Sequence, residues 1–297
     1  MADRGCSRTA IGVALQRALH ATLDTPPLLF NDPLAPLLLD PAALAAAAAC
    51  DSAATRALRF HCCLRSRYAE DRVALATARG VRRVVVLGAG LDTFALRQAA
   101  PSSCALSLNE VVEVDHPASA RDKRARLLAA GLTLPPNARV VEIDFATSSL
   151  VEGLGVSDAP TLFICLGVVM YLDAGAIDAL LRFVAAHPHG SELVFSFLNE
   201  EPLLPLPLPL PPLQPPASPT GMGGALFAGV PGASLAEQVA GLGEPFLSKH
   251  APAAFTALLL ARGFSAAHLL EAGEAQAAYP SSLLPQRWRT SIGHATV

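Results

Sequence analysis

Two glycines that follow a strand-like run are well suited to bring the main chain close to a ligand. Gly88 ends the apolar run at 83–88, Gly90 follows two residues later, and the loop continues through Asp92 and Thr93. Glycine allows a tight turn and a close approach that a side chain would block. Dinucleotide-binding loops carry a third glycine, and this sequence has Thr93 in its place. The loop therefore predicts ligand binding but does not by itself identify a dinucleotide.

Acidic residues end the next two strand-like runs. Asp115 ends the run at 111–115, where a carboxylate can accept hydrogen bonds from both hydroxyls of a ribose. Asp144 and Phe145 end the third run, where a carboxylate and an aromatic ring suit the amine and the face of an adenine. An alternative is that Asp115 only caps a helix beginning at Pro117. Together these residues predict a nucleoside site.

The acidic residue within the glycine loop has two interpretations. Asp92 either caps the following helix or contacts an amino group of the ligand, and we favour the cap. An acidic side chain would repel a pyrophosphate, but it is compatible with a ligand that carries an amino acid in its place. His116 and Tyr171 are candidate bases, but packing or capping explains each more simply, so no catalytic residue is assigned.

The elements that position these residues alternate between strand and helix patterns. Short runs rich in valine, isoleucine and phenylalanine are typical of buried parallel strands. Helix-length segments at 117–131 and 173–187 separate them. We expect an α/β fold with an open, mostly parallel sheet and helices on both faces. The five expected strands are 83–88, 111–115, 138–144, 161–167 and 192–197.

One domain with four parts is expected along the chain. Residues 1–80 read as a helical cover, with a long helix that Asp51 starts and Gly80 ends, and 81–200 as the α/β core. Residues 201–250 form a proline-rich variable insertion, and 251–297 a helix and a late strand. Within the insertion, the stretch 202–216 excludes helix and central strand by its proline content.

Composition narrows the classes of function. A net charge of -3 gives no basic face for nucleic acid, and the basic cluster at 121–126 is interpreted as a solvated helix face. No apolar run reaches the ~20 residues of a membrane span. No cleavable secretory segment is visible, and the six cysteines form no metal-type or disulfide-type pattern. We expect a cytoplasmic protein with free thiols and no metal site.

The motifs together resemble the bacterial branch of the leucine carboxyl methyltransferase family, of class I (Rossmann-like) fold. The resemblance rests on VVVLGAGLDTFALR, VVEVDHP, VVEIDF and FICLGVVMYL, with TAIGVALQRA, LFNDPLA, RSRYAED, GEPF and ARGF around them. It implies S-adenosylmethionine as cofactor and O-methylation of a small molecule or a carboxylate.

The resemblance also assigns roles to residues. It implies Gly88 and Gly90 around the methionine part of the cofactor, Asp115 on the ribose, and Asp144 with Phe145 on the adenine. Arg65 matches an arginine that pairs with the cofactor carboxylate, and Arg67 is the alternative. Two departures stand out, which are Leu166 where eukaryotic members carry glutamate, and Phe94 where many relatives carry arginine.

Two other functions remain open on the sequence alone. A nicotinamide-dependent oxidoreductase would share the pair of glycines and the acid of the second strand. A non-catalytic interaction protein could keep the fold without turnover, and the proline-rich insertion and Leu166 motivate that alternative.

Overall fold

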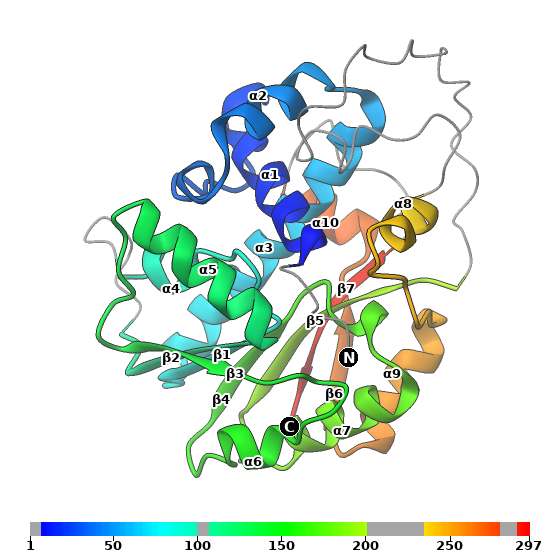
Figure 1. Ribbon diagram of the computed structural model, residues 1–297. Helices are drawn as coiled ribbons and strands as arrows, with labels where there is room; N and C mark the ends of the chain where they lie inside the picture. Colours follow the sequence, from blue (N-terminus) through cyan, green and yellow to red (C-terminus); the bar gives the residue numbers. More distant parts are fainter. Residues whose placement is uncertain (1–6, 100–106, 201–234, 280–289) are drawn as a thin grey trace.

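A seven-stranded sheet forms the centre of the computed structural model, which describes residues 7–99, 107–200, 235–279 and 290–297 (Figure 1). The strand order is β3-β2-β1-β4-β5-β7-β6. Strands β1 to β5 pair in parallel, and β7 runs antiparallel to both β5 and β6. The strands are β1 (Arg83–Leu87), β2 (Glu110–Asp115), β3 (Ala138–Glu142), β4 (Thr161–Cys165), β5 (Glu192–Leu198), β6 (Ala266–Leu269) and β7 (Thr290–Thr296).

The structure confirms the five expected strands as β1 to β5 and the late strand as β6, with ends that differ by a few residues. Two details differ from expectation. Strand β3 lies at the sheet edge and is only partly buried, because it has a neighbour on one side alone. Strand β7 was not expected, since its sequence TSIGHAT lacks the apolar run of the parallel strands.

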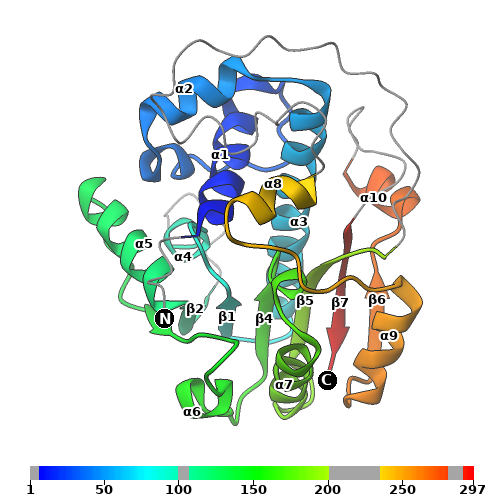
Figure 2. The same cartoon turned by 45° about the vertical axis from the view of Figure 1, so that its right-hand side comes forward.

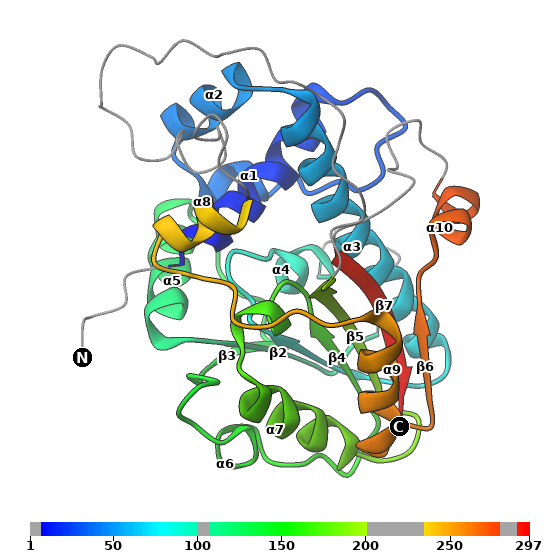
Figure 3. The same ribbon diagram turned by 90° about the vertical axis from the view of Figure 1, so that its right-hand side faces the viewer.

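Helices cover both faces of the sheet. One buried cluster joins the sheet to α7 and α9, and a second joins the opposite face to α3 and α10. Figure 3 shows α7 and α9 together on one side, with α3 on the other. The helices of this part are α4 (Phe94–Arg97), α5 (Pro117–Ala129), α6 (Leu150–Leu154), α7 (Ala174–Ala185), α8 (Leu235–Gly241), α9 (Pro252–Ala261) and α10 (Ala272–Ala278).

The N-terminal segment is helical, as expected. Its helices α1 and α2 lie above the sheet in Figure 1, whereas α3 extends down and packs against one face. The segment consists of α1 (Arg8–Leu23), a 3₁₀ turn η1 (Ala35–Leu38), α2 (Pro41–Ala49) and α3 (Ala53–Ala78). The long helix begins one residue later than predicted, because Ser52 and Thr55 form a reciprocal capping box. Asp51 instead forms ion pairs with Arg56 and Arg59.

The basic cluster at 121–126 is not wholly a solvated face, which corrects the expectation. Lys123 is 3% exposed and donates to Glu113 Oε2 at 2.6 Å and to the carbonyl of Asp92 at 2.6 Å. A buried lysine of this kind is tolerated because its charge is paired. It ties α5 to β2 and to the glycine loop.

The proline-rich stretch 202–216 lies outside the described residues. Among the helices that are described, none is long and apolar enough to cross a membrane.

Candidate functional site

A cavity of about 780 Å³ opens at the carboxyl ends of the parallel strands. Strands β1 and β4 are neighbours in the sheet, and the chain leaves β1 toward β2 on one side and β4 toward β5 on the other. Ligands of open α/β sheets bind at such a switch point. All six predicted site residues line this cavity, namely Arg65, Gly88, Gly90, Asp115, Asp144 and Phe145.

The glycine loop passes close to its neighbours, as its sequence predicted. Gly88 has a φ of +69°, and an added Cβ would lie 2.3 Å from Cγ2 of Val168. Gly90 has a φ of +50°, and its Cβ would lie 3.0 Å from the Cβ of Ala10 on α1. Both positions therefore require glycine on grounds of conformation and space.

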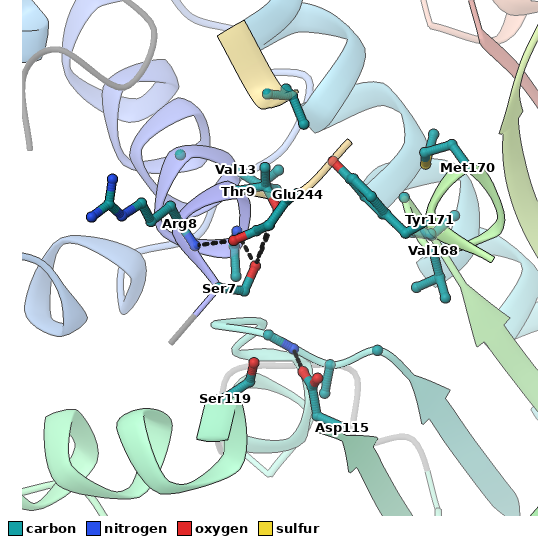
Figure 4. Close-up of a pocket in the computed structure, with 18 of the residues that line it drawn as sticks. Ser7, Arg8, Thr9, Val13, Asp115, Ser119, Val168, Met170, Tyr171 and Glu244 are labelled. Atoms are coloured by element: carbon teal, nitrogen blue, oxygen red, sulfur yellow. Dashed lines mark hydrogen bonds between the residues drawn. The ribbon is translucent and has the colours of Figure 1, made fainter. Parts of the chain in front are cut away.

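Asp115 orients toward the glycine loop and does not cap the next helix. Its Oδ2 accepts from the amide of Gly90 at 2.5 Å (Figure 4), and its Oδ1 accepts from that of His116 at 2.7 Å. Helix α5 is capped instead by the His116 ring, whose Nδ1 accepts from Ala118 at 3.2 Å. The alternative of a capping Asp115 is thus wrong, and the capping role expected of His116 is confirmed. Burial raises the pKa of Asp115 above its ordinary value.

The residues after β3 form the far end of the cavity. Asp144 Oδ1 accepts from the amide of Ala146 at 3.0 Å, which leaves Oδ2 facing Nε2 of His116 at 3.9 Å. The ring of Phe145 packs partly against the core beneath the sheet. The Asp144 carboxylate and the Phe145 ring therefore lie next to each other in the sequence at this end of the cavity, where both line the space for a ligand.

Arg65 brings a positive charge into the cavity from α3. It is 9% exposed, and no acceptor in the described part of the chain takes a hydrogen bond from its guanidinium. The group packs against Gly167 after β4, where an added Cβ would lie 2.7 Å from Nη1. Arg67 lies outside the cavity, is exposed, and pairs with Asp71 at 2.9 Å. Of the two candidate arginines, only Arg65 can reach a ligand in this cavity.

A buried network explains the threonine that replaces the third glycine. Thr93 donates to Oδ1 of Asp32 at 2.6 Å, and the Nε of Arg17 donates to Oδ2 at 2.8 Å. Arg17 also donates to the main-chain carbonyl of Leu91 at 2.7 Å. The glycine loop is thus fixed to α1 through Asp32. Sequence reasoning did not single out this aspartate, because its partners lie far away in the sequence.

Asp92 lies one residue before Thr93, the N-cap of α4, and its side chain binds the first amide of the helix, which supports the interpretation that we favoured. Its Oδ1 accepts from the amide of Phe94 at 2.8 Å. Burial opposes its ionisation, yet Arg17, Arg97 and Lys123 together hold the pKa of Asp92 below its ordinary value. Asp92 is therefore a charged residue of the loop, and the three nearby cations balance its charge.

The wall opposite the strand ends includes residues that sequence reasoning missed. Glu244, in the loop after α8, accepts hydrogen bonds from Ser7 and Thr9 and from the amide of Arg8, at the start of α1. Tyr171 completes this wall and packs on Phe246 with ring centres 5.4 Å apart. Burial raises the pKa of Tyr171 to about 12. In Figure 2, α8 lies beside α1 and α3, above the strands.

Comparison with known proteins shows to which family the chain belongs. The model of the family described as leucine carboxyl methyltransferase matches residues 10–185, which is more than half of the chain. The chain belongs to the leucine carboxyl methyltransferase family. The match includes the glycine loop, the acids after β2 and β3, and Arg65.

Curated relatives are bacterial proteins named as candidate S-adenosyl-L-methionine-dependent methyltransferases. YktD of Bacillus subtilis is 34% identical over 140 residues, which are 46% of this chain and 45% of that protein. A relative from Streptomyces coelicolor is 34% identical over 192 residues, or 60% of this chain and 63% of that protein. The matched part thus spans about half to two thirds of the length of these relatives.

Solved structures show the same fold. A candidate methyltransferase from Thermobifida fusca has a TM-score of 0.52 at 18% identity, covering 96% of this chain and 93% of that one. A DUF574 family protein from Streptomyces avermitilis has a TM-score of 0.50 at 16% identity, covering 96% of each chain. The chain has the class I methyltransferase fold, and its antiparallel β7 departs from the order 3-2-1-4-5-6 of dinucleotide-binding sheets.

Proposed function

We propose that the chain is an S-adenosylmethionine-dependent methyltransferase that methylates an oxygen of a small molecule or a carboxylate. The observation that carries the proposal is the buried guanidinium of Arg65, which has no acceptor among the described residues, in a cavity whose other end carries Asp115 and Asp144. A buried cation without a partner is costly unless a ligand supplies the anion. A ligand with a carboxylate at one end and a nucleoside at the other would bind Arg65 through the first and the two aspartates through the second.

Each part of the cofactor has a matching group in the cavity. Arg65 would hold the methionine carboxylate with two parallel hydrogen bonds, and the loop from Gly88 to Gly90 would enclose the methionine chain. Asp115 would accept from the ribose hydroxyls. Asp144 and Phe145 would hold the adenine. These assignments use the second lone pair of each Asp115 oxygen, since each already accepts one main-chain amide.

Leu166 leaves the amino group of the cofactor without the glutamate found in eukaryotic members. Leu166 lines the cavity and packs partly against the core. We infer that main-chain carbonyls of the glycine loop accept from the amino group instead. Asp92 is less suited because its carboxylate already accepts from the first amide of α4 and faces three cations.

The protein's contribution to the reaction is positioning and exclusion of water. The bound cofactor supplies a methyl group already activated on a sulfonium. The strand ends fix the position of the cofactor, while α1, α3 and the loop after α8 cover the cavity. Alignment of two reactants in a dry site accounts for much of the acceleration that such a transfer needs. A carboxylate acceptor needs no base at neutral pH, whereas an alcohol or phenol benefits from one.

Thermal unfolding with candidate ligands tests the proposal. S-adenosylhomocysteine should raise the melting temperature, because a ligand present at 100 times its Kd stabilises the native state by about 2.7 kcal/mol. NAD⁺ at the same concentration is the control and should leave the melting temperature unchanged. Stabilisation by NAD⁺ without stabilisation by S-adenosylhomocysteine would refute the proposal and favour an oxidoreductase.

A further inference from the structure

The cavity extends past the positions assigned to the cofactor. The groups proposed to hold the cofactor lie at the ends of β3, β2, β1 and β4, and the next strands in the sheet are β5 and β7 (Figure 2). Leu198 ends β5, Thr290 begins β7, and the two residues are register partners. Both line the cavity. The space over these two strand ends is therefore left for a second molecule, the methyl acceptor.

A hydrogen-bonded pair of side chains lines this part of the cavity. Oγ1 of Thr290 lies 2.7 Å from Nε2 of His61 and 3.3 Å from its Nδ1. His61 belongs to α3 and lines the cavity one helical turn before Arg65. The pair thus joins the helical cover to the sheet next to the position proposed for the methionine carboxylate.

The pair of His61 and Thr290 keeps hydrogen-bonding capacity for a ligand. Burial, with Arg65 nearby, lowers the pKa of His61 to about 3, so that the neutral ring offers one N–H and one lone pair. The Thr290 hydroxyl carries one proton, so it can donate to only one ring nitrogen. No other group in the described part of the chain forms a hydrogen bond with either side chain. One ring nitrogen and a lone pair of the hydroxyl are therefore left for a molecule in the cavity.

From this arrangement we propose that His61 and Thr290 hold the oxygen of the acceptor to which the methyl group is transferred. The inference rests on the proposed function and adds the residues that orient its second substrate. An alcohol or a phenol can both donate to and accept from the pair, and a carboxylate can accept from its N–H and O–H groups. Leu58 and Leu198, which also line the cavity, provide apolar surroundings in which such hydrogen bonds are stronger than in water.

Small aromatic probes with and without an oxygen atom test this assignment. Phenol, benzyl alcohol and benzoate carry the oxygen, and toluene is the probe that lacks it. Binding of each to the protein saturated with S-adenosylhomocysteine is measured by ligand-observed NMR, and the ring signals of His61 are followed in protein with isotope-labelled histidine. We expect at least one oxygen probe to bind at least tenfold more tightly than toluene and to shift the signals of His61. Which of the three binds identifies the class of the acceptor oxygen.

Variants of the two residues locate the contact. Thr290→Val and His61→Phe remove the polar atoms and keep most of the side-chain volume, so the affinity for the bound oxygen probe should fall at least tenfold. The affinity for S-adenosylhomocysteine should change less than threefold in both. Thr290→Ser restores the hydroxyl and should restore the affinity for the probe. His189→Phe, at an exposed position, is the matched control and should change neither affinity. His61→Leu serves if the phenylalanine variant does not fold.

Three results would overturn the inference. The wild-type protein binds none of the oxygen probes more tightly than toluene, or the preference survives in both Thr290→Val and His61→Phe, or these variants lose S-adenosylhomocysteine as strongly as the probe, which is the result expected of a purely structural pair. Binding of S-adenosylhomocysteine is measured separately in every sample. Its absence in the wild type would refute the proposed function, whereas its presence with any of these three results refutes only the role of His61 and Thr290.

Discussion

The hydroxyl of Thr93 donates a hydrogen bond to the carboxylate of Asp32 at 2.6 Å, across 61 residues of sequence. Both side chains are fully buried. The same threonine accepts from Nε of Arg97 at 2.8 Å, and Arg97 in turn pairs with Glu70 on α3. The position that holds a glycine in dinucleotide-binding loops is used here to join the glycine loop to the helical cover.

Thr93→Val should therefore destabilise the protein although it preserves the side-chain volume. The valine removes a donor to a buried carboxylate and leaves Arg97 without one acceptor. Loss of such a partner costs about 1–3 kcal/mol of unfolding free energy, which urea denaturation would measure. Thr147→Val, at an exposed position after β3, is the control and should change stability by less than about 0.5 kcal/mol. Equal effects of the two substitutions would contradict the role of Thr93.

Replacing each of the two candidate arginines in turn should show which of them binds the cofactor. Arg65→Met should weaken the binding of S-adenosylhomocysteine by at least 30-fold, because loss of a buried charge partner costs about 2–5 kcal/mol. Arg67→Met should change the affinity less than threefold, since Arg67 is exposed and pairs with Asp71. Isothermal titration calorimetry gives both values. A larger loss in the Arg67 variant would show that the arginine was assigned wrongly.

Sequence reasoning succeeded where local chemistry decides the structure. Apolar runs predicted β1 to β5, and the residues that end them converge because parallel strands all point to the same edge. It failed where contacts join distant segments. Nothing local to Asp32 or Glu244 indicates that the first reaches Thr93 and the second reaches α1. Strand β7 was missed because its stability comes from pairing with β5 and β6 instead of from its own composition.

Gly167→Ala should disturb the binding of S-adenosylhomocysteine through Arg65. The added methyl group would lie 2.7 Å from Nη1 of Arg65 and so displace the guanidinium. Gly131→Ala is a matched control, because Gly131 has a similar φ of +66° but no atom within 4 Å of the added Cβ. Both variants should lose a similar amount of stability, about 1 kcal/mol for the strained backbone. Only Gly167→Ala should also lose affinity, by at least tenfold in calorimetry.

The stability of the protein should fall as the pH is lowered from 7.5 to 5.5. Burial lowers the pKa of four histidines, among them His294 to about 4 and His61 to about 3. The rings of His294 and His61 stay neutral in the native state over this range, while the same residues in the unfolded chain take up a proton near pH 6.5. The unfolded state therefore binds more protons in this window, and the unfolding free energy rises with pH.

His294→Gln should reduce that dependence. One histidine that is protonated only in the unfolded state contributes at most about 1.4 kcal/mol per pH unit. The glutamine variant loses the hydrogen bond between the ring and Tyr68 at every pH, which lowers stability uniformly, but it also loses this slope. Urea denaturation at pH 7.5, 6.5 and 5.5 separates the two effects. His189→Gln, at an exposed position, is the control and should keep the wild-type slope. A slope unchanged by His294→Gln would mean that His294 is already protonated in the native state over this range.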